Sequence, residues 1–343
     1  MSIKYFKHYE NHTFAIVCIK TSSQLILTPD YKRPSILING HFETIYPALF
    51  RRVSGMNPHP ERITTPDDDF LDLDWYQNGN DSLVIICHGL EGNSRKPYML
   101  GMAKTMISIP ADVLTWNYRG CSGEMNKANR FYHSGATDDL DLVVQHGFDK
   151  GYKAITLIGF SLGGNLVLKY MGENAEHLDK RILASIAFSV PLDLEASSLK
   201  MKQWENYLYS KRFLRTLKKK VAGKESLKSE NLAFDKLGNI RDLFHFDDLF
   251  TGPLHGFKDA RDYYRSCSSL YSLNNIDRPT LIVNAQNDPF LSETCFPFKE
   301  LEEHPYIQFL APENGGHCGF ADFKNDIYWS EKQAYEFLKP ILL

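Results

Sequence analysis

The segment that most constrains the fold of this chain is LIGFSLGGNLVLKY, residues 157–170, where a serine stands between glycines at the junction of two apolar runs. The first run has the pattern of a buried strand and the second that of a helix. Residues 159–163, GFSLG, therefore match Gly-x-Ser-x-Gly in the strand–turn–helix context that exposes a nucleophilic serine. Glycines are needed on both sides because such a serine adopts a strained conformation with backbone close by. The alternative is a glycine-rich turn in which Ser161 caps the helix.

Short apolar runs alternate along the chain with segments of helical periodicity. This alternation predicts an α/β fold with a mostly parallel central sheet and helices on both faces. The segment RITTPDDDFLDLDWYQ, residues 62–77, alternates apolar and acidic residues and predicts an antiparallel hairpin at one edge. The predicted strands lie at 82–89, 111–120, 154–161, 182–191, 279–288 and 307–312, and the predicted helices at about 94–108, 137–149, 162–175 and 330–339.

One interval interrupts the alternation, because residues 192–277 show no strong strand but carry Lys, Leu, Tyr and Phe at helical spacing. We expect a single domain over 1–343, with an N-terminal extension of about 1–60 and a helical cap insertion of about 190–265. A helical insertion between two core strands is typical of a lid over an active site, and a purely structural excursion is the alternative. The Lys-rich part, 211–221, is expected to be a solvated helix face or to contact an anionic membrane surface transiently.

A serine hydroxyl is a weak nucleophile without a base, so an acid and a histidine should follow in the order Ser, Asp, His. Asp288 ends a predicted buried strand, in NAQNDPF, and His317 lies in the glycine-flanked loop PENGGHCGF after the next strand. Both therefore map to the sheet edge of Ser161, where Asp288 would orient His317 and His317 would take the serine proton. Asp322 and Asp326 violate the expected order because they follow the histidine.

The candidate donors to an oxyanion are the backbone amides of Leu90 and Leu162. Leu90 follows the strand-ending turn in CHGLEGNS, residues 87–94, whereas Leu162 begins the helix after the serine. There the helix dipole adds positive potential. Two other loops offer two interpretations each. Arg119 is expected to brace neighbouring backbone, and its alternative is a place near an anionic substrate. His133 could lie near the mouth of the active site, but a helix-capping Thr137 is expected to account for its segment.

Composition excludes several functional classes. The formal net charge of −3 gives no reason to expect nucleic acid as a partner. The six cysteines are scattered and none forms Cys-x-x-Cys, so neither a zinc or redox site nor a disulfide framework is expected. We expect no metal and no organic cofactor. The N-terminal twenty residues contain only a short, interrupted apolar patch, which favours a cytoplasmic location. Nothing in the sequence determines the oligomeric state.

Taken together, these segments resemble the YheT-type branch of the α/β-hydrolase fold family. The resemblance extends over nearly the whole chain and implies a hydrolase or esterase, with eukaryotic relatives that include lipid hydrolases and yeast ethanol acyltransferases. It implies that the nucleophile, acid and base are Ser161, Asp288 and His317. The segments that carry it are INGHFETIYPALFRR (38–52), TPDDDFLDLDW (65–75), HGLEGNS (88–94), NYRGCSG (117–123), GFSLGGNLVLKY (159–170), HFDDLFTGPLHGF (245–257), DYYRSCSS (262–269) and NGGHCGF (314–320). For INGHFETIYPALFRR, the resemblance implies only that this segment belongs to the N-terminal part of the family's proteins.

We therefore expect a serine carboxylic ester hydrolase that forms an acyl-enzyme on a small-molecule or lipid ester, with a short or medium acyl chain. An alcohol O-acyltransferase with the same three residues and a non-catalytic, ligand-binding relative are the alternatives. Because the base must be neutral, activity should rise through a pKa of about 6.5 to 7.5.

Overall fold

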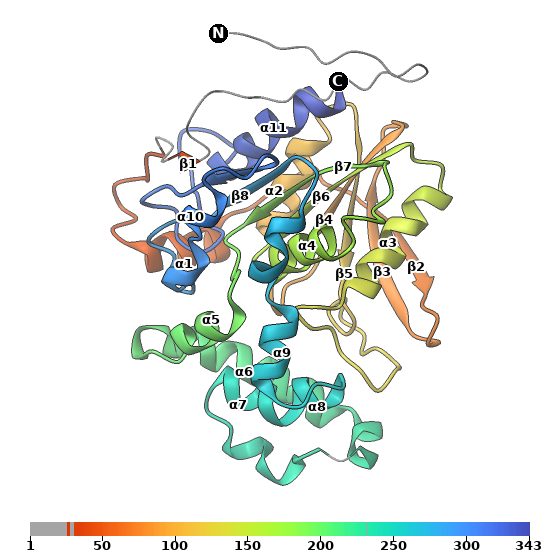
Figure 1. Cartoon of the computed structure of the whole chain (residues 1–343), viewed down its shortest axis with the longest axis vertical. Coiled ribbons are helices and arrows are strands. Elements are labelled where there is room, and N and C mark those ends of the chain that lie inside the picture. Colours follow the sequence, from red (N-terminus) through yellow and green to blue (C-terminus); the bar gives the residue numbers. More distant parts are fainter. Residues whose placement is uncertain (1–25, 28–30, 231) are drawn as a thin grey trace.

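The computed structural model describes residues 26–27, 31–230 and 232–343, and in this part of the chain a nine-stranded sheet lies between two layers of helices (Figure 1). The strand order is β1-β9-β8-β7-β6-β4-β5-β3-β2. This arrangement confirms the predicted α/β class. The strands are β1 (Ile26–Leu27), β2 (His59–Thr64), β3 (Phe70–Tyr76), β4 (Ser82–Cys87), β5 (Asp112–Asn117), β6 (Ala154–Phe160), β7 (Ile182–Phe188), β8 (Thr280–Val283) and β9 (Ile307–Leu310).

Most neighbouring strands run parallel, and the predicted hairpin is confirmed as the antiparallel edge. β2 pairs antiparallel with β3, and β3 pairs antiparallel with β5. β6 lies at the centre between β4 and β7, and all seven of its residues are buried. A strand that is covered on both faces has a continuous run of apolar residues rather than an alternating pattern. This explains why the sequence of β6, AITLIGF, is almost entirely apolar.

The helices divide into two layers and a separate group at one end of the sheet. α2 and α11 cover one face, whereas α3 and α4 cover the other (Figure 1). The helices are α1 (Gly40–Phe50), α2 (Pro97–Met106), α3 (Thr137–Asp149), α4 (Leu162–Glu173), α5 (Leu194–Met201), α6 (Tyr207–Gly223), α7 (Leu243–Phe246), α8 (Gly252–Leu254), α9 (Ala260–Cys267), α10 (Phe298–Leu301) and α11 (Trp329–Leu342), with a π-helical turn at Asp247–Thr251.

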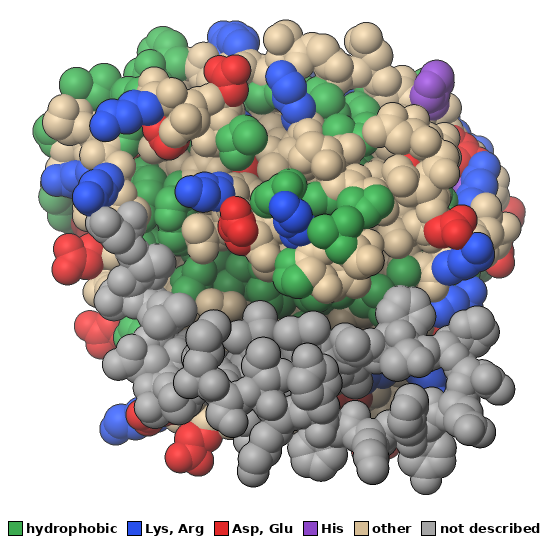
Figure 2. Space-filling view, turned by 90° about the horizontal axis from the view of Figure 1, so that it is seen from above, with side chains coloured by type: hydrophobic (Ala, Val, Ile, Leu, Met, Phe, Trp, Pro, Cys, Tyr) green, Lys and Arg blue, Asp and Glu red, His purple; other side chains and the backbone are tan. Residues whose placement is uncertain are grey.

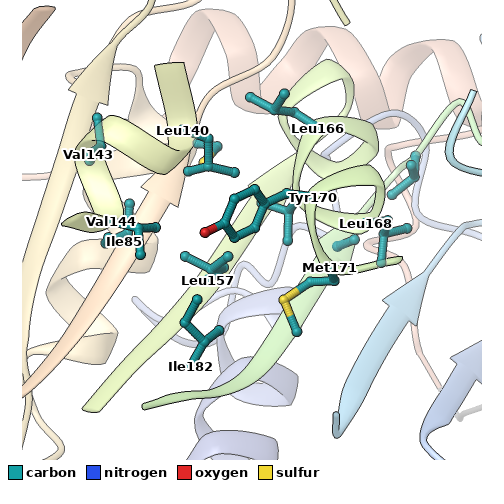
Figure 3. Packing of buried hydrophobic residues seen from close by; sticks show 14 of the residues in the cluster. Ile85, Leu140, Val143, Val144, Leu157, Leu166, Leu168, Tyr170, Met171 and Ile182 are labelled. Atoms are coloured by element: carbon teal, nitrogen blue, oxygen red, sulfur yellow. The ribbon is translucent and has the colours of Figure 1, made fainter. Parts of the chain in front are cut away.

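Successive residues of each central strand supply two separate cores, because side chains of a strand alternate between its faces. In β4, Ile85 packs into the core under α3 and α4, while its neighbour Ile86 packs into the core under α2 and α11. In the first core, the Tyr170 ring of α4 lies among aliphatic side chains of α3 and β6 (Figure 3). Its hydroxyl donates a hydrogen bond to Asp141 Oδ1 at 2.8 Å. These contacts hold α4, and hence the residue before it, against the sheet.

The segment between β7 and β8 forms helices α5 to α9, which lie beyond one end of the sheet (Figure 1). α5 begins at a side-chain cap, in which Asp193 accepts a hydrogen bond from the Ala196 amide at 3.0 Å. Apolar side chains of α6, α7 and the π-helical turn pack into a cluster of their own. The action of this segment as a cap, with bounds of about 190–265, stays a prediction.

Several expectations concern the surface and the N-terminal part. Of the expected extension over 1–60, residues 1–25 and 28–30 lie outside the described residues. They include the N-terminal twenty residues on which the expected cytoplasmic location rests. No helix in the described ranges is long and apolar enough to cross a membrane. On the face opposite α5–α9, described Lys and Arg side chains are interspersed with Asp and Glu (Figure 2). The described cysteines, all free, are Cys87, Cys121, Cys267, Cys295 and Cys318.

Arg119 has a structural role, but it bonds to carboxylate side chains of other segments and not to the neighbouring backbone that the sequence analysis expected. Its buried guanidinium bonds to Asp139 at 2.7 and 2.8 Å and to Asp69 at 2.8 Å. It also pairs with Asp67 at 2.9 Å. One cation therefore joins the turn between β2 and β3 to the start of α3.

Replacing Arg119 by methionine should lower the free energy of unfolding by about 3–5 kcal/mol, because the buried carboxylates of Asp69 and Asp139 lose their counter-ion. Urea unfolding followed by circular dichroism measures the change. Lys153→Ala, which removes the exposed ion pair with Asp81, is the control and should cost less than about 1 kcal/mol. Equally small effects of both variants would contradict a bracing role for Arg119.

Candidate active site

Ser161 lies at a strained corner between β6 and α4. Its backbone has φ 54° and ψ −119°, in the region that residues other than glycine rarely adopt. A Cβ at Gly159 would lie 2.2 Å from the Gly163 carbonyl oxygen, and a Cβ at Gly163 would lie 2.5 Å from the Cys87 carbonyl oxygen. Only glycine fits at both positions. The interpretation of Ser161 as a capping serine is wrong, because its side chain forms no cap hydrogen bond with α4.

The structure brings His317 and Asp288 to Ser161 from separate loops. His317 Nε2 lies 2.9 Å from Ser161 Oγ, and His317 Nδ1 lies 2.8 Å from Asp288 Oδ2. Because a carboxylate only accepts hydrogen bonds, Nδ1 carries the proton and a neutral ring leaves Nε2 free to accept from the serine. The Asp288 side chain is fully buried, and its other oxygen accepts from the Phe290 amide at 2.9 Å.

Burial and neighbouring charges shift the pKa of His317 in opposite directions. Burial favours the neutral ring and lowers its pKa, but the facing Asp288 carboxylate, with a smaller effect of Cys318, raises it. The net result is a His317 pKa above its ordinary value of about 6.5. The structure thus moves the pKa expected for His317, about 6.5 to 7.5, in the alkaline direction, because the Asp288 carboxylate stabilises the protonated ring.

Helix α1 positions the loop that carries His317, a role that the sequence did not indicate. The His317 amide donates to Thr44 Oγ1 of α1 at 2.9 Å. The Gly316 amide donates to Asn287 Oδ1 at 3.0 Å, and the Asn287 side chain donates to the buried Glu43 of α1 at 2.6 Å. Polar residues on the inner face of α1 were the only feature of the sequence that could have indicated this role. Their function is visible only in the structure, where the helix lies against a loop some 270 residues later in the chain.

The amides of Leu90 and Leu162 are both available for a ligand. Neither donates a hydrogen bond to any described residue, although both residues line the cavity beside Ser161. The amides on each side of Leu90 are already occupied, since Gly89 donates to the Tyr98 hydroxyl at 3.0 Å and Glu91 to the Tyr132 hydroxyl at 2.8 Å. The Leu90 amide, one of the two predicted oxyanion donors, is thus left without a hydrogen-bond partner among the described residues.

A cavity of about 140 Å³ lies beside Ser161 and His317, with side chains from α5 and α6 among its walls. Its volume is close to that of a cavity that holds one benzene molecule, about 150 Å³. The lining includes Leu90, Leu162, Leu194, Met201, Phe213, Leu217, Leu243 and Phe290, together with the polar His133, Asp247, Thr251, Tyr263 and Tyr264. A more open pocket of about 630 Å³ touches Asp288 but neither Ser161 nor His317, so it is not the reaction site.

Two residues that the sequence analysis did not include in the catalytic triad, His133 and Asp322, occupy different places relative to the candidate site. His133 lines the cavity of Ser161, and the helix-capping explanation of its segment is wrong because Ala136, not Thr137, is the N-cap of α3. Asp322, in contrast, accepts from Lys324 and Asn325 in its own loop and stays outside the site. Among the described residues, no group of three or more His, Cys, Asp or Glu side chains is arranged to hold a metal ion.

Several known proteins are similar to this chain in sequence or fold. Residues 82–323 match the family described as the alpha/beta hydrolase fold. "Putative esterase YheT" of Escherichia coli (strain K12) is 35% identical over 89% of this chain and 91% of that protein. A monoacylglycerol lipase of Saccharomyces cerevisiae (strain ATCC 204508 / S288c) is 29% identical over 80% of this chain and 62% of that protein. The solved Pyrococcus furiosus esterase Pf2001 has a TM-score of 0.56 at 20% identity, covering 85% of this chain and 97% of that chain.

Titration of His317 followed by NMR of ¹⁵N-labelled histidines should give a pKa above about 6.5, and Asp288→Asn should lower it, since burial then acts without the carboxylate. A raised folded-state pKa means that the pair stabilises the protein below pH 6.5, and that this contribution is lost as pH rises through the folded pKa. Asp322→Asn removes the same charge away from the site and is the control. A His317 pKa below 6.5 in the wild type would refute the assigned direction.

Proposed function

The chain belongs to the α/β hydrolase fold family, and we propose that it is a serine carboxylic ester hydrolase with Ser161 as its nucleophile. The observation that carries this proposal is the hydrogen-bonded series from Ser161 through His317 to the buried Asp288, beside a cavity of about 140 Å³. The similarity to proteins named esterase and monoacylglycerol lipase supports the class of reaction. The substrate in this proposal is a small-molecule or lipid ester.

In the first half of the reaction, Ser161 Oγ attacks the ester carbonyl carbon while its proton passes to His317 Nε2. The carbonyl oxygen becomes an oxyanion, which the Leu90 and Leu162 amides bind. Collapse of this tetrahedral intermediate breaks the carbon–oxygen bond to the alcohol, and His317 returns the proton to the leaving alkoxide. The products are a free alcohol and an acyl group esterified to Ser161.

In the second half, water attacks the acyl carbon and gives its proton to His317. The intermediate then releases the acid and Ser161 regains its proton from the imidazole. Asp288 stabilises the imidazolium formed in each half and keeps Nδ1 protonated. Because only the neutral imidazole accepts the serine proton, activity rises with pH as His317 loses its proton. A raised pKa places this limb on the alkaline side of 6.5.

Helices α5–α9 act in this proposal as a cap that closes the cavity over the ester. Support comes from contacts between the cap and the catalytic loops. Lys220 of α6 forms an ion pair with Glu91, beside the oxyanion amide, at 2.7 Å. The Tyr209 ring of α6 packs edge-on against Phe290, with centroids 4.7 Å apart, and Phe290 in turn packs on His317 at 4.2 Å. Cap closure and the geometry of the reacting groups are therefore linked.

The cap also carries a surface suited to transient contact with an anionic lipid layer. Trp204 is 86% exposed and Leu208 is 75% exposed, with the exposed Tyr207 between them. Tyr207 and Leu208 begin helix α6, which is strongly basic and has the sequence YLYSKRFLRTLKKKVAG. Exposed aromatic and leucine side chains beside Lys and Arg are typical of segments that lie in a membrane interface.

Replacing Ser161 by alanine should abolish labelling by a fluorophosphonate probe and reduce turnover of p-nitrophenyl esters by at least about 10⁴-fold, since the nucleophile is lost. Ser108→Ala, an exposed serine remote from the cavity, is the control and should react like the wild type. Retained activity in Ser161→Ala would falsify the assignment. Product analysis in the presence of ethanol distinguishes hydrolysis from acyl transfer, because an acyltransferase would yield the ethyl ester.

Replacing both Trp204 and Leu208 by serine should reduce hydrolysis of a lipid ester in anionic vesicles severalfold and leave the turnover of a soluble ester unchanged, because the side chains contribute only to the lipid contact. Vesicle co-sedimentation gives the binding in the same samples. Tyr271→Ala, which changes an exposed aromatic residue outside the cap, is the matched control. Equal losses on soluble and vesicle substrates would argue against a lipid-contacting surface.

A further inference from the structure

The cavity beside Ser161 has a polar wall that the proposed reaction does not use. Asp247 lies on this wall and begins a five-residue π-helical turn, Asp247–Thr251, between α7 and α8. Turns of the π type are rare and frequently occur at functional sites. This irregular turn lies in the segment of the cap that places the Asp247 carboxylate on the cavity wall.

The Asp247 carboxylate is held in place but only partly satisfied. Tyr264 donates to Oδ2 at 2.6 Å and Thr251 donates to Oδ1 at 2.5 Å. A carboxylate offers about four acceptor positions, so Asp247, which lines the cavity, retains the capacity to accept further hydrogen bonds. In the described part of the chain, no Lys, Arg or His forms an ion pair with Asp247. Burial raises the pKa of Asp247 to about 6, against the opposing effect of Thr251 and Tyr264, so the group is mostly ionised at neutral pH.

A hydrogen-bond donor lies on the same wall. The Gly135 amide donates to His133 Nδ1 at 3.2 Å, so in the neutral ring the proton is on Nε2. Burial lowers the pKa of His133 well below 6.5, which keeps the ring neutral. No described residue accepts a hydrogen bond from its Nε2. The Tyr263 ring connects the two groups, since it packs against His133 at 5.9 Å and against Tyr264 at 5.1 Å.

This combination suits a hydroxyl group and disfavours an anion. A hydroxyl donates one hydrogen bond and accepts others, which matches an unpaired carboxylate and a neutral imidazole N–H. A phosphate or carboxylate group on the substrate would be repelled by Asp247, and the cavity lining contains no Lys or Arg to offset the repulsion. We propose that Asp247, with His133, forms a subsite that binds a hydroxyl group of the ester substrate and so selects neutral, hydroxyl-bearing esters.

The proposal rests on the ester hydrolase function and specifies its substrate class. The cavity is small, about 140 Å³, so the hydroxyl lies within a few bonds of the ester group. A site built to hydrogen-bond a substrate hydroxyl discriminates strongly against the analogue that lacks it, because its own buried polar groups are then left unpaired. Asp247 contacts the substrate in this proposal but takes no part in bond making or breaking.

The test uses two pairs of esters that differ only by hydroxyl against methyl: hydroxyethyl butyrate with propyl butyrate, and ethyl β-hydroxybutyrate with ethyl isovalerate. The quantity measured is the ratio of kcat/KM for hydroxyl over methyl within each pair. In the wild type this ratio should exceed 1 for at least one pair, and Asp247→Asn should lower it by about 10-fold or more. Hydroxyethyl butyrate phosphorylated on its hydroxyl should be a poor substrate that improves in Asp247→Asn.

The matched control is Asp248→Asn, which changes the next residue of the same turn but lies outside the cavity lining. It should leave the ratio unchanged. Asp247→Leu serves as a second variant, because it removes all acceptor capacity while the side chain still branches at Cγ. Equal ratios in the wild type, Asp247→Asn and Asp247→Leu overturn the subsite while the hydrolase function stands. Failure of the wild type to cleave any of the esters, together with failure to react with a fluorophosphonate, overturns both proposals.

Discussion

The close approach of backbone around Ser161 is the constraint on which the rest of the structure depends. Gly159 and Gly163 have no room for a Cβ, and Ser161 itself has a φ of 54°. The strain at this corner persists only because buried strands and a well-packed α4 hold both sides of it. The result is a serine side chain that cannot cap the helix that follows it and instead lies within hydrogen-bond distance of His317.

Burial gives the charged groups of this protein fixed partners. Around Arg119, a cation and three carboxylates join the β2–β3 turn to α3. At the candidate site, a buried Asp288 holds one nitrogen of His317 and raises the pKa of the ring above its ordinary value. The first arrangement stabilises the fold, whereas the second also prepares the chemistry, because it orients a base and stabilises the charge that the base acquires.

Helices α5–α9 supply cavity walls that the sheet and the helices covering it do not provide. The sheet presents Ser161 at the carboxyl end of its central strand β6, but more than half of the residues that line the cavity come from the α5–α9 segment. Apolar side chains of these elements suit a short acyl group, and the polar wall with Asp247 suits a hydroxyl. The same segment exposes Trp204 and Leu208. In our proposals, substrate selection and lipid contact are therefore both properties of the inserted helices, whereas the chemical steps depend on residues of the core.

By itself, the sequence determined the α/β class, the edge hairpin and the elbow, and it singled out Ser161, Asp288 and His317. Buried strands, turn glycines and the edge at which parallel strands end leave signals within a few residues. The tertiary structure alone decided that α1 holds the His317 loop, that His133 and Asp247 share the cavity, and in which direction the His317 pKa moves. These features depend on contacts between distant segments and on the burial that those contacts create. Neither can be inferred from the spacing of residues within a short stretch of sequence.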